Sequence, residues 1–343
     1  MRSHFRTFVV LALAVGLLAL FLQNVDLRRV AGHISRAHPA WLIVSLTTMV
    51  ANLAIRSLRW QYLLEPLGHA SFANAFRATA VGFAASAVLP ARAGEVIRPY
   101  FLSRHEPMSA TGAFATIILE RALDTITVLA LLTSYVFVFG RELGQANPAA
   151  FRGVKWAGAT AGAAALAVFI VLFVLAGDPA RLGRLMARLA QILPSALAAA
   201  VARIAETFAT GLGAIRRPGR LLVALAWSFP LWLCIATGTW AVAQAFDLGI
   251  PYTGSFLLVS LLVIGVAVPT PGSIGGFHEA FRLGTTTFYG TPNDTAVAAA
   301  LVLHAFSILP ALLLGLTFAA QAGLNLSGMR QMADTAAQEG HPA

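Results

Sequence analysis

Charged residues are scarce in this sequence of 343 residues. Asp, Glu, Lys and Arg make up 11% of the chain, whereas 58% of the residues are hydrophobic and the mean hydropathy is +0.76. Soluble domains contain about one quarter charged residues. The composition therefore excludes an ordinary soluble domain and predicts an all-α, polytopic integral membrane protein.

Cysteine is nearly absent, and so are the common catalytic motifs. The single cysteine, Cys234, lies in an apolar stretch, which excludes a disulfide framework and a thiolate metal site. The sequence contains neither a Walker A motif nor a G-x-S-x-G motif. The pair His278-Glu279 is not a zincin motif, because the residue four positions after His278 is Arg282. We therefore expect no enzymatic activity, no cofactor and no metal.

Negative charge is the rarer sign, with 14 Asp and Glu against 24 Lys and Arg. An excess of positive charge on a soluble protein would suggest a nucleic-acid partner. Here the arginines lie at the ends of apolar stretches, as Arg56 and Arg59 do, and in a polar stretch at 178–218. The positive-inside rule accounts for that placement and puts both groups on the cytoplasmic side. We therefore expect no nucleic-acid partner.

Long apolar runs are present, and most are long enough to cross a bilayer. A spanning helix needs about 20 apolar residues. The six expected spans cover residues 7–24, 40–60, 111–139, 154–176, 220–245 and 294–321. The first is expected to stay uncleaved because no small-x-small cleavage site follows it. Trp41 and Trp60, at the two ends of the second span, fit interfacial anchors, and 25–39 reads as a polar loop.

Two further apolar stretches, roughly 72–104 and 253–288, are interrupted by proline and glycine. The expected break residues are Pro90, Gly94, Pro269, Pro271, Gly272 and Gly275. Such residues leave backbone groups unpaired, and hydrocarbon offers those groups no water. The broken backbone must therefore be buried in protein or line a wet cavity, which predicts two re-entrant hairpins.

The order of elements predicts one domain, 1–325, built from two halves. Half 1 covers about 7–139 and half 2 about 154–321, and each half has the order span, span, broken hairpin, span. An amphipathic cytoplasmic connection at 178–218 lies between them, and 326–343 would be a disordered tail. Arginine placement puts both termini in the cytoplasm and gives the halves opposite orientations. Such an inverted repeat with paired broken helices is typical of a transporter binding site.

One predicted span carries three charges within five residues, which are Glu120, Arg121 and Asp124. The two carboxylates are four residues apart and share one helix face, and Arg121 can reach Asp124. Each charge at the centre of a span costs about 2.5–3.5 kcal/mol, so the three must face the protein interior and pair. The sequence leaves open whether they form a structural ion-pair cluster or a binding site.

Charged residues also follow the first break. Arg92 and Arg98 could hold a phosphate group, with Gly94 allowing backbone N–H groups to approach the anion. Alternatively, the two arginines are interfacial side chains that pair with Glu95.

A comparable group, His278, Glu279 and Arg282, follows the second break. His278 can change charge near neutral pH, which favours a function, but all three residues also fit an ordinary helix start. His304, which stands alone in an apolar span, is interpreted as a core histidine with one hydrogen-bond partner.

Four pieces of the sequence, in their order along the chain, resemble the flippase-like transmembrane domain of lysylphosphatidylglycerol synthases, which also occurs as a stand-alone membrane protein. The pieces are R-S-L-R-W-Q-Y-L-L (Arg56–Leu64), L-P-A-R-A-G-E-V-I-R (Leu89–Arg98), L-E-R-A-L-D (Leu119–Asp124) and P-T-P-G-S-I-G-G-F-H-E (Pro269–Glu279). The resemblance covers about 7–325. It differs from the family pattern at His278, which takes about the place where the family often has Glu.

The resemblance implies a lipid flippase of the bacterial inner membrane. Its substrate would be an anionic or aminoacylated phospholipid, or another lipid-linked head group. Four arginines would bind the anionic part: Arg92, Arg98, Arg121 and Arg282. The carboxylates Glu95, Glu120 and Asp124 would pair with the arginines and could bind a head-group amine, while His278 or a carboxylate could carry a coupling proton. Because no synthase domain accompanies these residues, we expect no synthase activity.

Two other functions remain open at this point. The same breaks would suit an ion-coupled carrier of a small soluble anion, which needs a closed aqueous site. A scaffold that organises an envelope-lipid enzyme without moving anything is the second alternative. An intramembrane enzyme using Glu120 and Asp124 is disfavoured because no nucleophile or metal set accompanies them. Expected partners are a membrane phospholipid, a second copy of the chain and a lipid-modifying enzyme.

Overall fold

A computed structural model describes most of the chain. The described ranges are 25–89, 92–139, 148–177, 218–268 and 270–324, together with a few single positions at 16–22 and 328. Within those ranges all regular structure is helical and no strand occurs.

Several predictions concern residues outside the described ranges. They are most of the first span at 7–24, nearly all of the connection at 178–218, most of the tail at 326–343, and the break residues Pro90 and Pro269.

Four helices are long and apolar enough to cross a membrane, as counted over the described part of the chain. They are α3 (Pro39–Leu64), α8 (Pro148–Gly177), α11 (Pro218–Ala245) and α14 (Asn293–Gln321). Each coincides with a predicted span, because an uninterrupted apolar run of about this length forms a helix wherever backbone groups must bond within the segment. The chain is therefore a multi-pass membrane protein.

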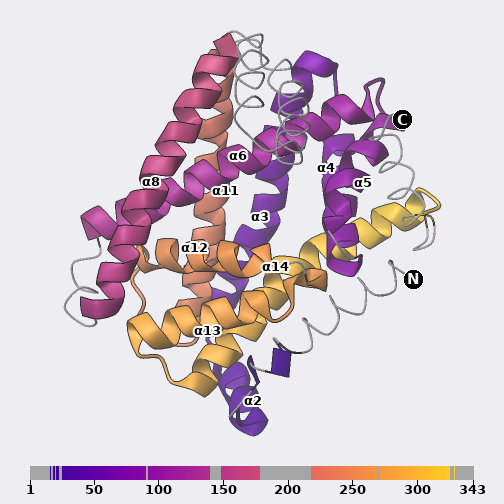
Figure 1. The fold of residues 1–343 in the computed structure, drawn as a ribbon. Coiled ribbons are helices and arrows are strands. Elements are labelled where there is room, and N and C mark those ends of the chain that lie inside the picture. Colours follow the sequence, from indigo (N-terminus) through magenta and orange to yellow (C-terminus); the bar gives the residue numbers. More distant parts are fainter. Residues whose placement is uncertain are drawn as a thin grey trace, which may run out of the picture.

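The predicted span at 111–139 is also helical, but it is not apolar enough to be counted with these four. It consists of α6 (Ala110–Ser134), which starts after the side-chain cap of Ser109 and continues as a π-helical turn, η3 (Tyr135–Phe139). Its interior carries the charged group Glu120, Arg121 and Asp124. In Figure 1, α6 crosses the molecule obliquely behind α8 and in front of α3 and α11.

Each predicted broken stretch forms two helices with a turn between them. In the first, α4 (Phe72–Val88) is followed by α5 (Gly94–Ser103). In the second, α12 (Gly254–Ala267) is followed by a 3-10 turn, η4 (Pro271–Ser273), and α13 (Gly276–Tyr289). We call these pairs hairpin 1 and hairpin 2. Figure 1 shows hairpin 1 in the upper part of the molecule and hairpin 2 in the lower part.

Both hairpins are closed by a contact between two glycines. A Cβ atom on Gly94 would collide with the carbonyl oxygen of Gly82, and one on Gly276 would collide with the carbonyl oxygen of Gly265. The two helices of each hairpin can approach this closely only because these positions have no side chain. The glycine pairs therefore explain why the chain turns back on itself at both places.

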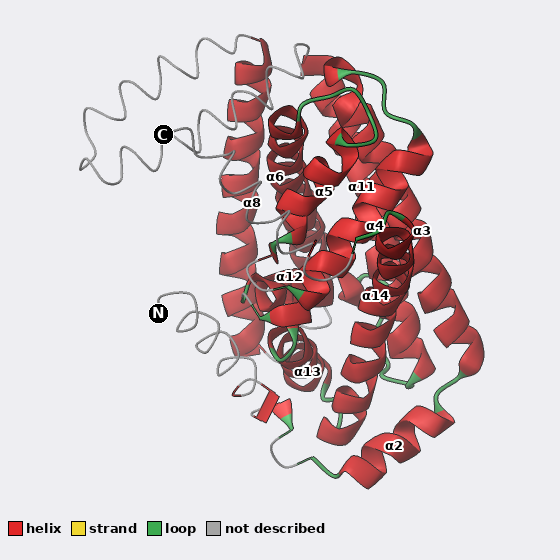
Figure 2. Cartoon of the chain, turned by 90° about the vertical axis from the view of Figure 1, so that its right-hand side faces the viewer, coloured by secondary structure: helices red, strands yellow, loops and turns green. Residues whose placement is uncertain are grey.

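The predicted polar loop at 25–39 is wrong, because most of it forms α2 (Leu27–Arg36). Asp26 caps this helix by accepting hydrogen bonds from the backbone amides of Arg28 and Arg29. Leucine, valine and isoleucine at 27, 30 and 34 give it one apolar face, and the helix packs against α14. In Figure 2 it lies at one end of the molecule, and α8 runs along one side.

Candidate functional site

A cavity of about 570 Å³ lies between the two hairpins. Hairpin 1 contributes Arg92, Glu95 and Arg98 to its wall, and the turn of hairpin 2 contributes Thr270, Gly272 and Ser273. Residues of α3, α6, α11 and α14 complete the lining, and they are a mixture of apolar, polar and charged side chains. The two predicted breaks, more than 160 residues apart in the sequence, therefore face one common space.

The turns of the two hairpins touch each other. The guanidinium of Arg92 donates a hydrogen bond of 2.7 Å to the carbonyl oxygen of Val266, at the carboxyl end of α12. Cations are favoured there because the last carbonyls of a helix are partly negative. Arg92 itself has a φ of 54°, and Gly272 in the other turn has a φ of 58°. The carbonyl of Gly272 lies 2.8 Å from Nε2 of His304 on α14.

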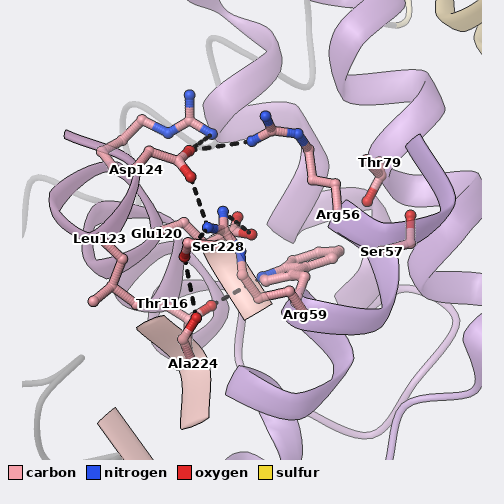
Figure 3. A network of polar contacts seen from close by, with 12 residues as sticks. Arg56, Ser57, Arg59, Thr79, Thr116, Glu120, Leu123, Asp124, Ala224 and Ser228 are labelled. Atoms are coloured by element: carbon pink, nitrogen blue, oxygen red, sulfur yellow. Dashed lines mark hydrogen bonds and ion pairs between the residues drawn. The ribbon is translucent and has the colours of Figure 1, made fainter. Parts of the chain in front are cut away.

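A network of ion pairs lies beside the cavity and joins α3 to α6 (Figure 3). The guanidinium of Arg59 is 2.6 Å from Asp124 and 3.2 Å from Glu120. Arg56, one helical turn earlier on α3, is 3.2 Å from Asp124. Ser228 on α11 accepts a 2.7 Å hydrogen bond from Arg59, so three helices meet at these charges.

Hairpin 1 is tied into the same network. Arg98 forms a 2.6 Å ion pair with Glu120, and its guanidinium lies 3.8 Å from the ring centre of Trp60. This geometry is a cation–π contact. On α6, Arg121 lies 3.3 Å from Asp124, and Trp232 donates a 3.0 Å hydrogen bond to the same carboxylate. Asp124 is thus surrounded by three arginines and one indole.

The charged residues differ greatly in their access to the cavity. Arg59 and Glu120 are fully buried and do not line it. The side chains of Arg92 and Arg121 are 43% and 39% exposed, and that of Glu95 is 34% exposed. Arg92 and Arg121 are therefore the most exposed cations of the cavity lining, while the buried Glu120 pairs with Arg59 and Arg98.

Several guanidinium nitrogens in this network have no hydrogen-bond partner among the described residues. They are Nε of Arg56, Nε of Arg59, Nε and Nη2 of Arg98, and Nε of Arg121. Buried polar groups in native proteins are nearly always bonded, so each exception calls for an explanation. The pattern indicates that the network holds more donors than its own carboxylates satisfy.

The charged residues after the second break do not line the cavity. Arg282 pairs with Glu279 at 2.8 Å and donates to the Asn293 side chain at 3.0 Å, so this group is satisfied locally. His278 accepts the Gly275 backbone amide at 3.3 Å, and its ring centre is 4.3 Å from that of His304. The prediction that these three residues bind a head group gains no support from the cavity.

Three residues of the network were interpreted differently from the sequence. The sequence placed Arg56 and Arg59 at a cytoplasmic span end and Trp60 as an interfacial anchor, without assigning any of them to the site. The structure buries all three, with the two arginines paired to α6 and Trp60 beneath Arg98 of hairpin 1. The signal that could have revealed them is their spacing of three and four residues, which places the first two on one helix face. The expected role of Gly94 also changes, because its missing side chain is required by the contact with Gly82.

Outside the membrane-spanning helices, one carboxylate in a loop is held by neutral groups. Glu106 accepts hydrogen bonds of 2.8 Å from the backbone amide of Ser71 and from the side chain of Asn74. These bonds favour the charged form and hold the pKa of Glu106 below its usual range. These bonds tie the loop after hairpin 1 to the residues at the start of hairpin 1.

Among the described residues no group of three His, Cys, Asp or Glu side chains could hold a metal ion.

Comparison with known proteins places these features in a family. A sequence model described as the lysylphosphatidylglycerol synthase TM region matches residues 7–315, which is most of the chain. The chain is also similar to the UPF0104 membrane protein MJ1595 of Methanocaldococcus jannaschii, with 25% identity over 127 residues. A second relative is the glycosyltransferase AglD of Haloferax volcanii, with 28% identity over 122 residues.

These two similarities cover only part of each protein. The first covers 36% of this chain and 38% of the Methanocaldococcus protein. The second covers 35% of this chain and 20% of the Haloferax protein. The chain therefore matches well under half of the length of either relative.

Proposed function

This chain belongs to the lysylphosphatidylglycerol synthase TM-region family, and from that premise we propose that it is a lipid translocase. It would move an anionic or aminoacylated phospholipid, or another lipid-linked head group, between the two leaflets. The observation that carries the proposal is the cavity between the hairpins. An apolar membrane protein keeps charged side chains there at considerable cost, and such groups mark substrate pathways.

In this proposal the head group enters the cavity while its acyl chains stay in lipid. A cavity of about 570 Å³ is in the range of small-molecule sites and is suited to a head group. Arg121 and Arg92 would meet the anion first because they are the exposed cations. Arg98 would then exchange part of its contact with Glu120 for the ligand. Glu95 is the accessible carboxylate that could meet a head-group amine.

Movement between leaflets would come from the contact between the hairpin turns. Arg92 holds the Val266 carbonyl of hairpin 2, and an anion that competes for this guanidinium would loosen that contact. Binding and opening would then be coupled, because a ligand shifts an equilibrium by its different affinity for the two states. His278 or a carboxylate could carry a coupling proton, as the sequence suggested.

The same proposal includes the membrane topology of the chain. The chain would have six spans and two re-entrant hairpins that enter the membrane from opposite sides, within an inverted repeat. The similar glycine contacts of the hairpins, and their positions in the upper and lower parts of Figure 1, support this arrangement. We place the protein in the bacterial inner membrane with both termini in the cytoplasm, on the basis of arginine placement.

Partners and chemistry follow from the proposal. The chain would carry out no covalent reaction, and a lipid-modifying enzyme would supply or consume its substrate. One relative is named a glycosyltransferase, and the match covers one fifth of that protein. Its name supports a range of proposed substrates that includes lipid-linked head groups as well as phospholipids. A homodimer is proposed on the family resemblance alone.

The test is leaflet exchange in liposomes that contain this protein as their sole protein. Fluorescent head-group-labelled anionic and aminoacylated lipids are placed in both leaflets, and the outer label is quenched chemically. The proposal expects quenching of more than the outer half of the label, while protein-free liposomes lose only that half. Liposomes that take up a radiolabelled soluble anion but exchange no lipid would favour the soluble-anion carrier. Liposomes that show neither lipid exchange nor anion uptake would favour the scaffold.

A further inference from the structure

The ion-pair network at the cavity contains more positive than negative charges. Its ion pairs involve five arginines and three carboxylates, and one arginine and one carboxylate of these, Arg92 and Glu95, form a separate pair that is counted with the network because both line the cavity. The arginines are Arg56, Arg59, Arg92, Arg98 and Arg121, and the carboxylates are Glu95, Glu120 and Asp124. Arginine stays protonated in proteins, and carboxylates paired with arginine stay ionised. The network therefore carries two more positive than negative charges.

Nothing else among the described lining residues offsets this excess. Apart from the network, the cavity is lined by apolar side chains, by neutral hydroxyl and amide groups, and by His304. A histidine can add positive charge but cannot remove it. The ion pair between Arg282 and Glu279, which follows the second break, is balanced and lies outside the cavity lining.

The excess charge also accounts for the unpaired donors. Five guanidinium nitrogens of the network lack acceptors, and four of these five belong to arginines that line the cavity. A phosphate group brings several strong acceptor oxygens, and its bonds to guanidinium groups are among the strongest that proteins form. A neutral or cationic ligand would leave the excess positive charge uncompensated.

From this imbalance we propose that the cavity selects head groups carrying two negative charges, which means a phosphomonoester or a diphosphate on a lipid. A phosphomonoester carries about −1.5 to −2 charges at pH 7 and so matches the excess. A phosphodiester lipid carries one negative charge and leaves one positive charge unmatched. An aminoacylated head group adds a cation, which disfavours it further. The inference rests on the proposed function and narrows its substrate class.

The experiment compares single-chain ligands that differ in charge. Purified full-length protein in neutral detergent micelles is titrated calorimetrically with dodecyl phosphate and with methyl dodecyl phosphate, its monoanionic diester. Because one further charge pair near a protein surface is a strong interaction, we expect the monoester to bind at least about tenfold more tightly. Equal affinities would overturn the inference. A third titration with glycerol phosphate separates the sources, since tighter binding of this soluble dianion would assign the cavity to a soluble phosphate.

A matched pair of variants tests the charge count directly. Thr125 is an exposed residue of α6 that lines the cavity one turn after Arg121. Thr125→Glu adds one negative charge and should reduce the preference for the monoester several-fold, whereas Thr125→Gln should keep it. A preference that is unchanged in Thr125→Glu would contradict the charge-matching argument even if the protein binds both ligands.

Failure of the charge-matching inference can be separated from failure of the translocase proposal. A protein that binds dodecyl phosphate preferentially but exchanges no labelled lipid would retain the inference and lose the proposed function. A protein that exchanges monoanionic and dianionic labelled lipids at equal rates, with equal affinities, would retain the function and lose the inference.

Discussion

The two hairpins have the same construction but different chemistry. Each consists of two helices that meet at a glycine pair, Gly82 with Gly94 and Gly265 with Gly276. Hairpin 1 sends Arg98 into a buried network that reaches α3 and α6. Hairpin 2 has no such network among its described residues: its charged pair is satisfied locally and its turn is held by imidazoles.

This difference shows what the fold requires. Hairpin 2 turns back on itself with a glycine contact and without a network of this kind among its described residues. A hairpin of this construction therefore does not require the arginines and carboxylates that surround hairpin 1. That observation favours a binding site over a purely structural ion-pair cluster, which were the two alternatives that the sequence left open.

The largest effect is expected from breaking the network at its centre. Arg59→Gln leaves Asp124 and Glu120 without their most buried partner, and breaking a buried ion pair costs about 3–5 kcal/mol. Thermal unfolding in detergent should show a large loss of stability. Arg220→Gln is the control, because that arginine is partly exposed and pairs with Glu65 away from the cavity. Equal stability of the two variants would contradict the assigned role of Arg59.

Substitutions of the glycine pairs should affect both hairpins alike. Gly94→Ala and Gly276→Ala each force a methyl group against a backbone carbonyl, and such overpacking costs about 1–3 kcal/mol. Gly153→Ala is the matched control, since no atom lies within 4 Å of its added Cβ. Unfolding midpoints of the three variants provide the measurement. A loss confined to one hairpin would show that the two are not built on the same contact.

The charged pair of hairpin 2 should matter less. Arg282→Gln removes bonds to Glu279 and Asn293, and we expect a loss of about 1–3 kcal/mol at most, because a net hydrogen bond to a charged group contributes about that amount. The affinity of the Arg282→Gln variant for dodecyl phosphate should stay within about twofold of that of the unsubstituted protein, since neither Arg282 nor Glu279 lines the cavity. A tenfold loss of affinity would restore the sequence-based assignment of Arg282 to the binding site.

The smallest effect is expected in the loop that follows hairpin 1. Glu106→Gln weakens the bonds to Ser71 and Asn74 and should cost about 1 kcal/mol at neutral pH. Because the folded protein lowers the pKa of this carboxyl, its contribution is present above the unfolded pKa of about 4.3 and is lost as the pH falls through the lower folded value. The unfolding midpoints of the two proteins should differ at pH 7, and the difference should shrink as the pH falls below about 4.3. A difference that does not change with pH would contradict this account.

Helix positions were largely predictable from the sequence, whereas the network was not. Apolar runs fix the spans, and proline with glycine fixes the breaks, so the predicted bounds of α3, α11 and α14 lie within two or three residues of the observed ones except at the carboxyl end of α3. The helix α2 was missed because its cap, Asp26, lies in a stretch rich in arginine. Arg56 and Arg59 were not assigned to the network because an arginine at a helix end is already explained by the positive-inside rule, and their partners are more than 60 residues away.

The central claim is that the charged cavity between the hairpins carries a lipid head group, and leaflet exchange in proteoliposomes tests it most directly. Labelled lipids are quenched in liposomes containing the unsubstituted protein, Arg121→Gln or Arg220→Gln. Arg121 is exposed to the cavity, whereas Arg220 is not in its lining. The account predicts rapid exchange with the unsubstituted protein and with Arg220→Gln, and at least about tenfold slower exchange with Arg121→Gln, because one strong ligand contact is lost. Equal exchange by all three, or exchange by none, would contradict it.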